Sequence, residues 1–273
     1  MSKIKTELYP QSIRKGDAAG LAKKKAKKSL WLELFSGVTG LILAGFILGH
    51  FVLESTMLFG DETYGAVAYF MEHTLPIAQV AIFVVTILFF IHFITASRKI
   101  PGKLEDRKRM LELGKNLKNS TQKWNQNPKD YTALKKHLVT ELWIWQVRTG
   151  MIILALGSFH LFLVLWNIFS KYEFMGFIKE YGLTGEVAHG RVESGLWILY
   201  LVLGISVVLH LSVGLYRLAV KWFADTWFTR KKAFVISSLI FWFYLLLNIA
   251  GVMALAGVPF FHGLFGELFG GAV

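Results

Sequence analysis

The pattern of apolar and polar residues divides this chain into five long hydrophobic segments separated by polar connections. Each segment exceeds the ~20 residues that an α-helix needs to cross a bilayer. The first, third and fourth are long enough that their helices must tilt or project beyond the lipid. The sequence therefore predicts an all-α integral membrane protein with five transmembrane helices. The segments are approximately Leu30–Phe59, Leu75–Ala96, Leu142–Ser170, Val192–Phe223 and Ala233–Phe261.

The composition agrees with this membrane interpretation. Of 273 residues, 54% are hydrophobic, and the mean hydropathy is +0.48. That is too apolar for a soluble domain of this size. The first segment is too long for the core of a cleavable signal. We divide the chain into a basic tail (1–29), a transmembrane domain (30–261) that contains a polar loop (99–140), and a short tail (262–273).

The positive charge is unevenly distributed along the chain, which has a net charge of +12. Nine Lys and Arg residues precede residue 30, and twelve lie between Arg98 and Lys136. The connection 60–74 and the end of the chain after Ala233 have none. The positive-inside rule then places the N-terminus and loop 99–140 in the cytoplasm and the C-terminus outside. Because the basic residues flank membrane segments, nucleic-acid binding is not predicted.

Two features indicate partner proteins: the basic loop 99–140, and the lack of cysteines and of nucleotide-binding motifs. Loops of this length are usually functional or mobile, and its basic surface suits an acidic cytoplasmic partner. Electrostatic anchoring to anionic lipid is the alternative. The chain has no cysteine, which excludes disulfides, cysteine-ligated iron–sulfur clusters and c-type haem attachment. It also has no G-x-G-x-x-G strand-to-helix unit and no P-loop, so it has no recognisable flavin or nucleotide site.

Four histidines lie inside the first four hydrophobic segments, one in each. Ionisable residues at membrane depth are rare and usually functional. The helical rise places His50 and His160 roughly 24 and 27 Å from the cytoplasmic side, and His92 and His210 about 9 and 16 Å from it. Two depth-matched pairs from different helices predict bis-histidine ligation of two haems. The alternative is four buried histidines that hydrogen-bond to carbonyls or hydroxyls.

Two haems also require space and partners for their anionic propionates. Glycines of the first and third segments leave room for porphyrin edges or for close helix packing. Ser36, Trp143 and Lys221, near cytoplasmic helix ends, and Arg191, at the outer start of the fourth segment, are candidate propionate partners. For the Trp, Lys and Arg residues, anchoring at the membrane interface is the alternative role. The glycines are Gly37, Gly40, Gly45, Gly49, Gly150 and Gly157.

Three stretches around these histidines resemble one known family. They are T-G-L-I-L-A-G-F-I-L-G-H (39–50), G-S-F-H-L (157–161) and the highly specific L-H-L-S-V-G-L-Y-R-L-A-V-K-W (209–222). From about Trp31 to Trp222 the chain resembles the dihaem cytochrome b subunit of menaquinol:fumarate reductase, in the succinate dehydrogenase/fumarate reductase family. The resemblance implies a five-helix anchor in the bacterial inner membrane, attached on its cytoplasmic face to an FAD flavoprotein subunit and an iron–sulfur subunit. It leaves open whether the complex dimerises.

The resemblance also implies roles for the site residues. Trp143 and Lys221 fall where the family contacts the propionates of the haem nearer the cytoplasm, the proximal haem. Ser36 matches less closely because neighbouring polar residues differ, and Arg191 matches the partner of the other, distal haem with a one-residue shift. By motif match, the two b haems have as ligands His50 and His160 (distal) and His92 and His210 (proximal).

Quinol oxidation releases two protons, so a base must lie near the quinol. The first connection offers several candidates, among which the residues alone do not decide. The family carries its quinol-site glutamate at the position of Glu72, twenty-two residues after His50. The resemblance therefore predicts Glu72 as the catalytic base. The candidates are Glu54, Asp61, Glu62, Glu72 and His73.

The function implied by the resemblance is electron transfer from menaquinol, through two haems, to partner subunits that reduce fumarate to succinate. The same parts running in reverse would make a succinate:menaquinone reductase. A hydrogenase or formate-dehydrogenase cytochrome b is a weaker rival. A proton-coupled transporter with histidine relays is an alternative of another class, and the five-segment count without an internal repeat argues against it.

Overall fold

The fold is a bundle of long helices. The computed structural model describes residues 15–71, 77–124, 138–169, 190–223, 229–258 and 261, and these contain no strand. Within these residues, five helices are long and apolar enough to cross a membrane, which confirms the predicted fold class. The elements are α1 (Lys15–Glu54), 3-10 helix η1 (Ser55–Phe59), α2 (Asp61–Tyr69), α3 (Ile77–Ser97), α4 (Ile100–Trp124), α5 (Leu138–Phe169), π-helix η4 (Val192–Leu196), α7 (Trp197–Trp222) and α8 (Arg230–Leu255).

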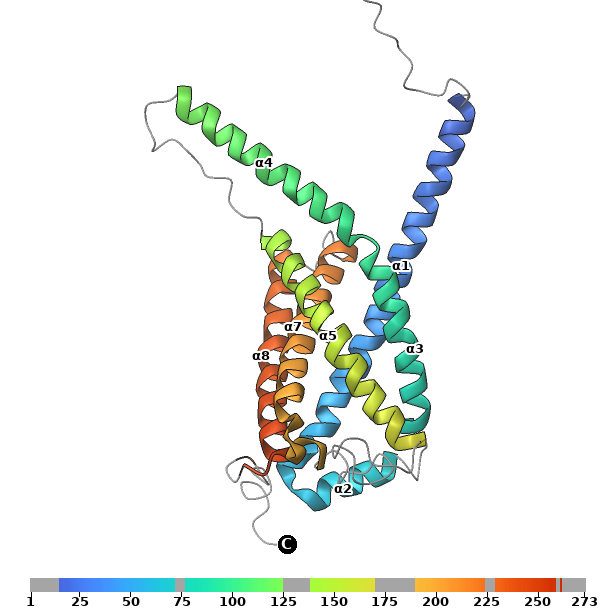
Figure 1. Cartoon of the computed structure of the whole chain (residues 1–273), viewed down its shortest axis with the longest axis vertical. Helices are drawn as coiled ribbons and strands as arrows, with labels where there is room; N and C mark the ends of the chain where they lie inside the picture. Colours follow the sequence, from blue (N-terminus) through green and yellow to red (C-terminus); the bar gives the residue numbers. More distant parts are fainter. Residues whose placement is uncertain are drawn as a thin grey trace, which may run out of the picture.

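The five spanning helices run alternately up and down (Figure 1). Helix α7 packs between α5 and α8, and α1 packs against α3. Helix α2 lies across one end of the bundle, and α4 extends from the opposite end (Figure 1). Apolar residues one or two turns apart on α8, such as Leu239, Phe243 and Leu246, remain exposed on its outer surface. A surface of this kind suits contact with lipid rather than water.

Two basic segments form longer helices than the sequence predicted. Helix α1 begins at Lys15, so the lysine-rich part of the tail continues the first span without a break. Residues 100–124, expected as part of a loop, form α4, so the loop interpretation is wrong for this stretch. Leu, Lys, Arg and Glu are good helix formers, and Glu105 and Arg109 form an ion pair at 2.7 Å one turn apart. Arg107 also reaches Glu141 of α5 at 3.7 Å.

A buried corner connects α1 to α2, an element that the sequence analysis did not predict. Met57 and Leu58 of η1 are each only 1% exposed and pack with Val192 and the end of α8. The chain then reverses at Gly60, whose φ of 110° is accessible to glycine but strained for other residues. The corner therefore fixes where α2 lies beneath the bundle.

Helix α7 packs closely against α8 at a glycine, Gly204. A Cβ atom added at Gly204 would lie 1.9 Å from Oδ1 of Asn248, which is buried on α8. We expect Gly204→Ala to lower the melting temperature in detergent, because overpacking of a close contact costs about 1–3 kcal/mol.

The matched control for this prediction is Gly65→Ala, because a Cβ at Gly65 would meet nothing within 4 Å. Adding Asn248→Ala to the Gly204 variant should recover much of the lost stability, since the clash is removed. Equal melting temperatures for Gly204→Ala and Gly65→Ala would contradict the packing argument.

Candidate functional site

The candidate site is a cavity of ≈ 900 Å³ inside the bundle. Its walls come from all five spanning helices, and it is elongated enough to reach both His50, near the end of α1, and Lys221, near the end of α7. The eight predicted haem-site residues that the structure describes all line it: Ser36, His50, His92, Trp143, His160, Arg191, His210 and Lys221.

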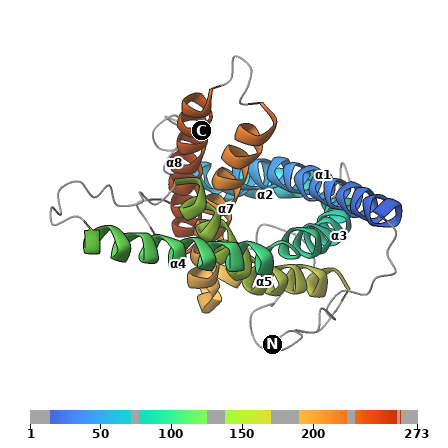
Figure 2. The ribbon, with the colours of Figure 1, turned by 90° about the horizontal axis from the view of Figure 1, so that it is seen from above.

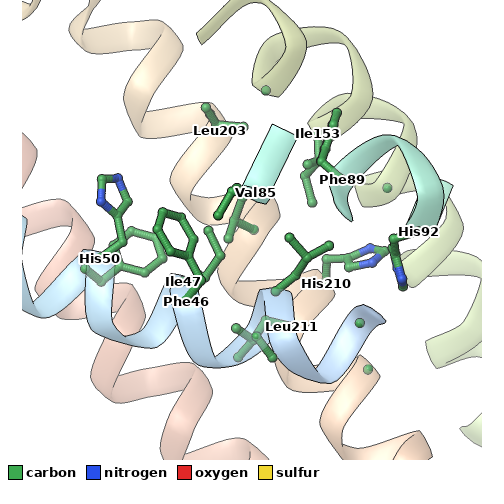
Figure 3. Close-up of a pocket in the computed structure, with 18 of the residues that line it drawn as sticks. Phe46, Ile47, His50, Val85, Phe89, His92, Ile153, Leu203, His210 and Leu211 are labelled. Carbon is green, nitrogen blue, oxygen red and sulfur yellow. The ribbon is translucent and has the colours of Figure 1, made fainter. Parts of the chain in front are cut away.

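The four histidines meet as two pairs within this cavity. The ring centroids of His50 and His160 are 6.5 Å apart, and those of His92 and His210 are 6.4 Å apart. Figure 3 shows His50 on one side of the cavity and His92 with His210 on the other. These are the pairs that the depth calculation produced from the sequence. Their ligation of haem stays a prediction.

The spacing within each pair fits one metal ion between two rings. A metal–imidazole nitrogen bond is about 2.0–2.1 Å long, and the ring centroid lies about 1.1 Å behind the nitrogen, so two opposed rings have centroids about 6 Å apart. Among the described residues, no group of three or more His, Asp or Glu side chains could hold a bare metal ion. A pair of rings needs further ligands around the metal, and a porphyrin provides four.

We call His92 and His210 the inner pair, because the sequence places them nearer the cytoplasm. The same dipeptide on two helices orients both rings. Nδ1 of His92 lies 3.2 Å from Oγ1 of Thr39, and Nδ1 of His210 lies 3.4 Å from Oγ1 of Thr149 and 2.9 Å from the carbonyl oxygen of Gln146. Each threonine donates its own hydroxyl to a backbone carbonyl one turn earlier. The threonine oxygens therefore accept from Nδ1–H, which leaves Nε2 free to bind a metal.

Glycine follows each of these threonines and makes room for the same ring. A Cβ at Gly40 would lie 2.8 Å from Cε1 of His92, and a Cβ at Gly150 would lie 3.1 Å from Cε1 of His210. Gly45 and Gly49 line the cavity with nothing within 4 Å of an added Cβ, so they leave space for a large planar group. The other two predicted glycines, Gly37 and Gly157, meet apolar side chains.

His50 and His160, called the outer pair for the same reason, have different hydrogen-bond partners. Nδ1 of His160 lies 3.4 Å from the hydroxyl of Tyr200, and the guanidinium of Arg191 lies near that hydroxyl. Within the described residues His50 makes no hydrogen bond to a hydroxyl. Its Nδ1 lies 3.9 Å from Oε1 of Glu54, one turn later on α1. The outer pair is thus set between an acidic and a basic group.

Arg191 fits an anion at the outer end of the cavity. It is only 6% exposed, and its Nε has no hydrogen-bond partner within the described residues. A buried guanidinium with an unpaired N–H is costly. A carboxylate such as a haem propionate would satisfy it.

The candidates at the other end form a charged cluster that the sequence analysis missed. Glu33 of α1 hydrogen-bonds to Lys221 of α7 and lies 3.2 Å from Lys99, just beyond α3. Lys103 lies 5.7 Å from the ring centroid of Trp143. Glu33 therefore pairs with Lys221, the lysine expected to meet a propionate. The three cations around it leave capacity for further anions.

The predicted base and four further histidines cannot be placed. Glu72, His73, His137, His189 and His262 lie outside the described residues. Of the other acids in the first connection, Glu54 lines the cavity, whereas Asp61 and Glu62 are exposed at the start of α2. The role of Glu72 stays a prediction from the resemblance.

A family model and individual relatives all point to the same protein family. Residues 122–247 match the family model described as the succinate dehydrogenase/fumarate reductase transmembrane subunit. The chain is 32% identical over 212 residues to the fumarate reductase cytochrome b subunit of Helicobacter pylori, covering 74% of this chain and 72% of that one. It is 31% identical over 208 residues to the protein of that name from Wolinella succinogenes, covering 73% and 70% of the two chains.

Proposed function

Because this chain belongs to the family of succinate dehydrogenase/fumarate reductase transmembrane subunits, we propose that it is the cytochrome b subunit of a quinol:fumarate oxidoreductase and that it holds two b haems. The observation that carries the proposal is the pair of histidine rings at each end of one cavity, with centroids 6.5 and 6.4 Å apart. When bound, the two haems supply one-electron carriers across the membrane.

The chain's own residues hold these groups in place. His50 with His160 would hold one haem through Nε2, and His92 with His210 would hold the other, since their Nδ1 atoms face neighbouring side chains or backbone. Arg191 receives the propionates of the outer haem. Ser36, Trp143 and Lys221 receive those of the inner haem.

Menaquinol is the proposed electron donor, and it reacts near the outer pair of histidines. Glu72 accepts a proton from the quinol hydroxyl as electrons leave. The partner subunits then reduce fumarate to succinate in the cytoplasm. The reverse direction, from succinate to menaquinone, uses the same residues.

The iron–sulfur and flavoprotein subunits dock on the end of the bundle that carries α4. The lysine-rich start of α1 and the basic helix α4 extend outward from the bundle at this end (Figures 1 and 2). Positive charge at this end supports a cytoplasmic orientation for it in a bacterial inner membrane, with the C-terminus outside. Contact of α4 with anionic lipid is the alternative use of the same charge.

The test of assembly uses the complex and the isolated chain. We expect the intact complex to couple oxidation of a menaquinol analogue to fumarate reduction, and the isolated chain to lack this activity because it has no flavin motif. Crosslinks from lysines of α4 should reach the iron–sulfur subunit. Crosslinks found only from the opposite end of the bundle would contradict this docking face.

A histidine-bearing transporter remains the alternative of a different class. Reduced-minus-oxidised absorbance of the purified chain separates the two functions. Bands typical of b haem support the cytochrome, and their absence supports the transporter.

A further inference from the structure

Among the four paired histidines, His50 differs in the charge of its neighbour. The Nδ1 atoms of His92, His160 and His210 lie beside hydroxyl or carbonyl oxygens, all neutral. His50 instead lies beside the carboxylate of Glu54, with 3.9 Å between Nδ1 and Oε1. Both side chains line the cavity. The outer pair therefore has an acidic neighbour that the inner pair lacks.

The position of the Glu54 carboxylate is fixed by a tyrosine from another element. The hydroxyl of Tyr64 on α2 donates to Oε2 of Glu54 at 3.0 Å. Tyr64 is 8% exposed, and its burial, followed by the nearby charge of Glu54, raises the pKa of its phenol well above the ordinary value. The phenol therefore stays protonated and remains a donor. This contact leaves Oε1 as the oxygen nearer His50.

The corner at the end of α1 makes this contact possible. Glu54 is the last residue of α1, and Tyr64 is on the first turn of α2, after the reversal at Gly60. Met57 and Leu58, each 1% exposed, hold the corner in the core of the bundle. The carboxylate is therefore held between Tyr64, beyond this buried corner, and the ring of His50.

We propose that Glu54 is a positioning residue that places a negative charge beside His50 and thereby lowers the reduction potential of the haem held by His50 and His160. The inference rests on the proposed function. A carboxylate next to the second nitrogen of a ligating imidazole raises the basicity of that ligand. A more basic ligand and a nearby negative charge both favour the oxidised, more positive iron. Arg191, on the His160 side through Tyr200, acts in the opposite direction.

The test is a redox titration of both haems in the intact complex. Glu54→Gln keeps the shape of the side chain and removes its charge. We expect the potential of the His50/His160 haem to rise by about 59 mV, a tenfold change in a one-electron equilibrium, while that of the other haem is unchanged. Glu54→Asp retains the charge and should give a potential between those of the unaltered chain and Glu54→Gln.

Glu62→Gln is the matched control, because Glu62 is an exposed acid on α2 close to Glu54 in the sequence. Its removal changes the net charge equally, so an equal shift in this variant would overturn the proposal. Two haems with unchanged potentials in Glu54→Gln would also overturn it and leave the proposed function standing. Absence of both haems from the unaltered chain would instead reject the proposed function.

A loss of the outer haem in Glu54→Gln is also informative. Retention of that haem in Glu54→Asp would then support the carboxylate as the feature that positions His50. Loss in both variants would overturn the proposal, because it would indicate a packing role for the glutamate side chain.

Discussion

A chain carrying His92→Ala will bind one b haem where the unaltered chain binds two. The ring of His92 lies opposite that of His210, and Thr39 and Gly40 shape its surroundings. With alanine at position 92, His210 alone would hold this haem, and no other described histidine is positioned to replace His92. His210→Ala should have the same effect. The haem-to-protein ratio, measured by pyridine haemochrome titration, should fall from about two to about one.

The outer pair provides the reciprocal experiment. His50→Ala and His160→Ala should also leave one haem, but the haem that remains should be the one lost in the His92 and His210 variants. Redox titration distinguishes the two haems, because each variant retains a single potential. His137→Ala, in the basic connection of the sequence, serves as the control and should keep both haems. A ratio of one haem or none in the unaltered chain would reject the two-haem proposal.

The sequence was sufficient for the spans and for the pairing of the histidines. Both follow from simple periodic geometry, since hydrophobic length sets a span and helical rise sets the depth of a residue. His50 and His160 occur far apart in the chain, yet the first and third spans run in the same direction and bring them to one depth. The structure places their rings beside each other.

The details around the rings depend on contacts between helices, which depth alone does not predict. Thr39 and Thr149 contact rings on other helices, although the repeated Thr-Gly dipeptide in the first and third spans was a usable signal. The Glu54–Tyr64 contact depends on the reversal at Gly60 and had no such signal. The polar composition of residues 100–124 predicts a loop, whereas the Leu, Lys, Arg and Glu residues of this stretch favour helix α4.

The lysine at the inner end shows a second limit of prediction from sequence. The position of Lys221 near a helix end predicts it as a propionate partner. In the structure it meets Glu33, which lies on another helix and is shared with Lys99. A charge is easily located from sequence, but its partner is decided by which helices are neighbours.

Glu72→Gln should abolish menaquinol oxidation while both haems remain bound. Quinol must lose two protons as it loses two electrons, so a missing base stops the reaction at its first step. Removal of a general base typically lowers the rate by about 10²–10⁴-fold. Fumarate reduction driven by a viologen dye should be unaffected, because the dye delivers electrons without quinol chemistry and the partner subunits are unchanged.

The comparison that makes this result specific is Glu62→Gln. Glu62 belongs to the same connection and is exposed, so losing its charge should leave quinol oxidation near the level of the unaltered complex. If Glu72→Gln loses haem as well as activity, the residue supports the fold of the connection rather than deprotonating the quinol. If Glu72→Gln retains full quinol activity, the base is a different group. Glu54, which lines the cavity beside His50, is then the acid best placed to accept the proton.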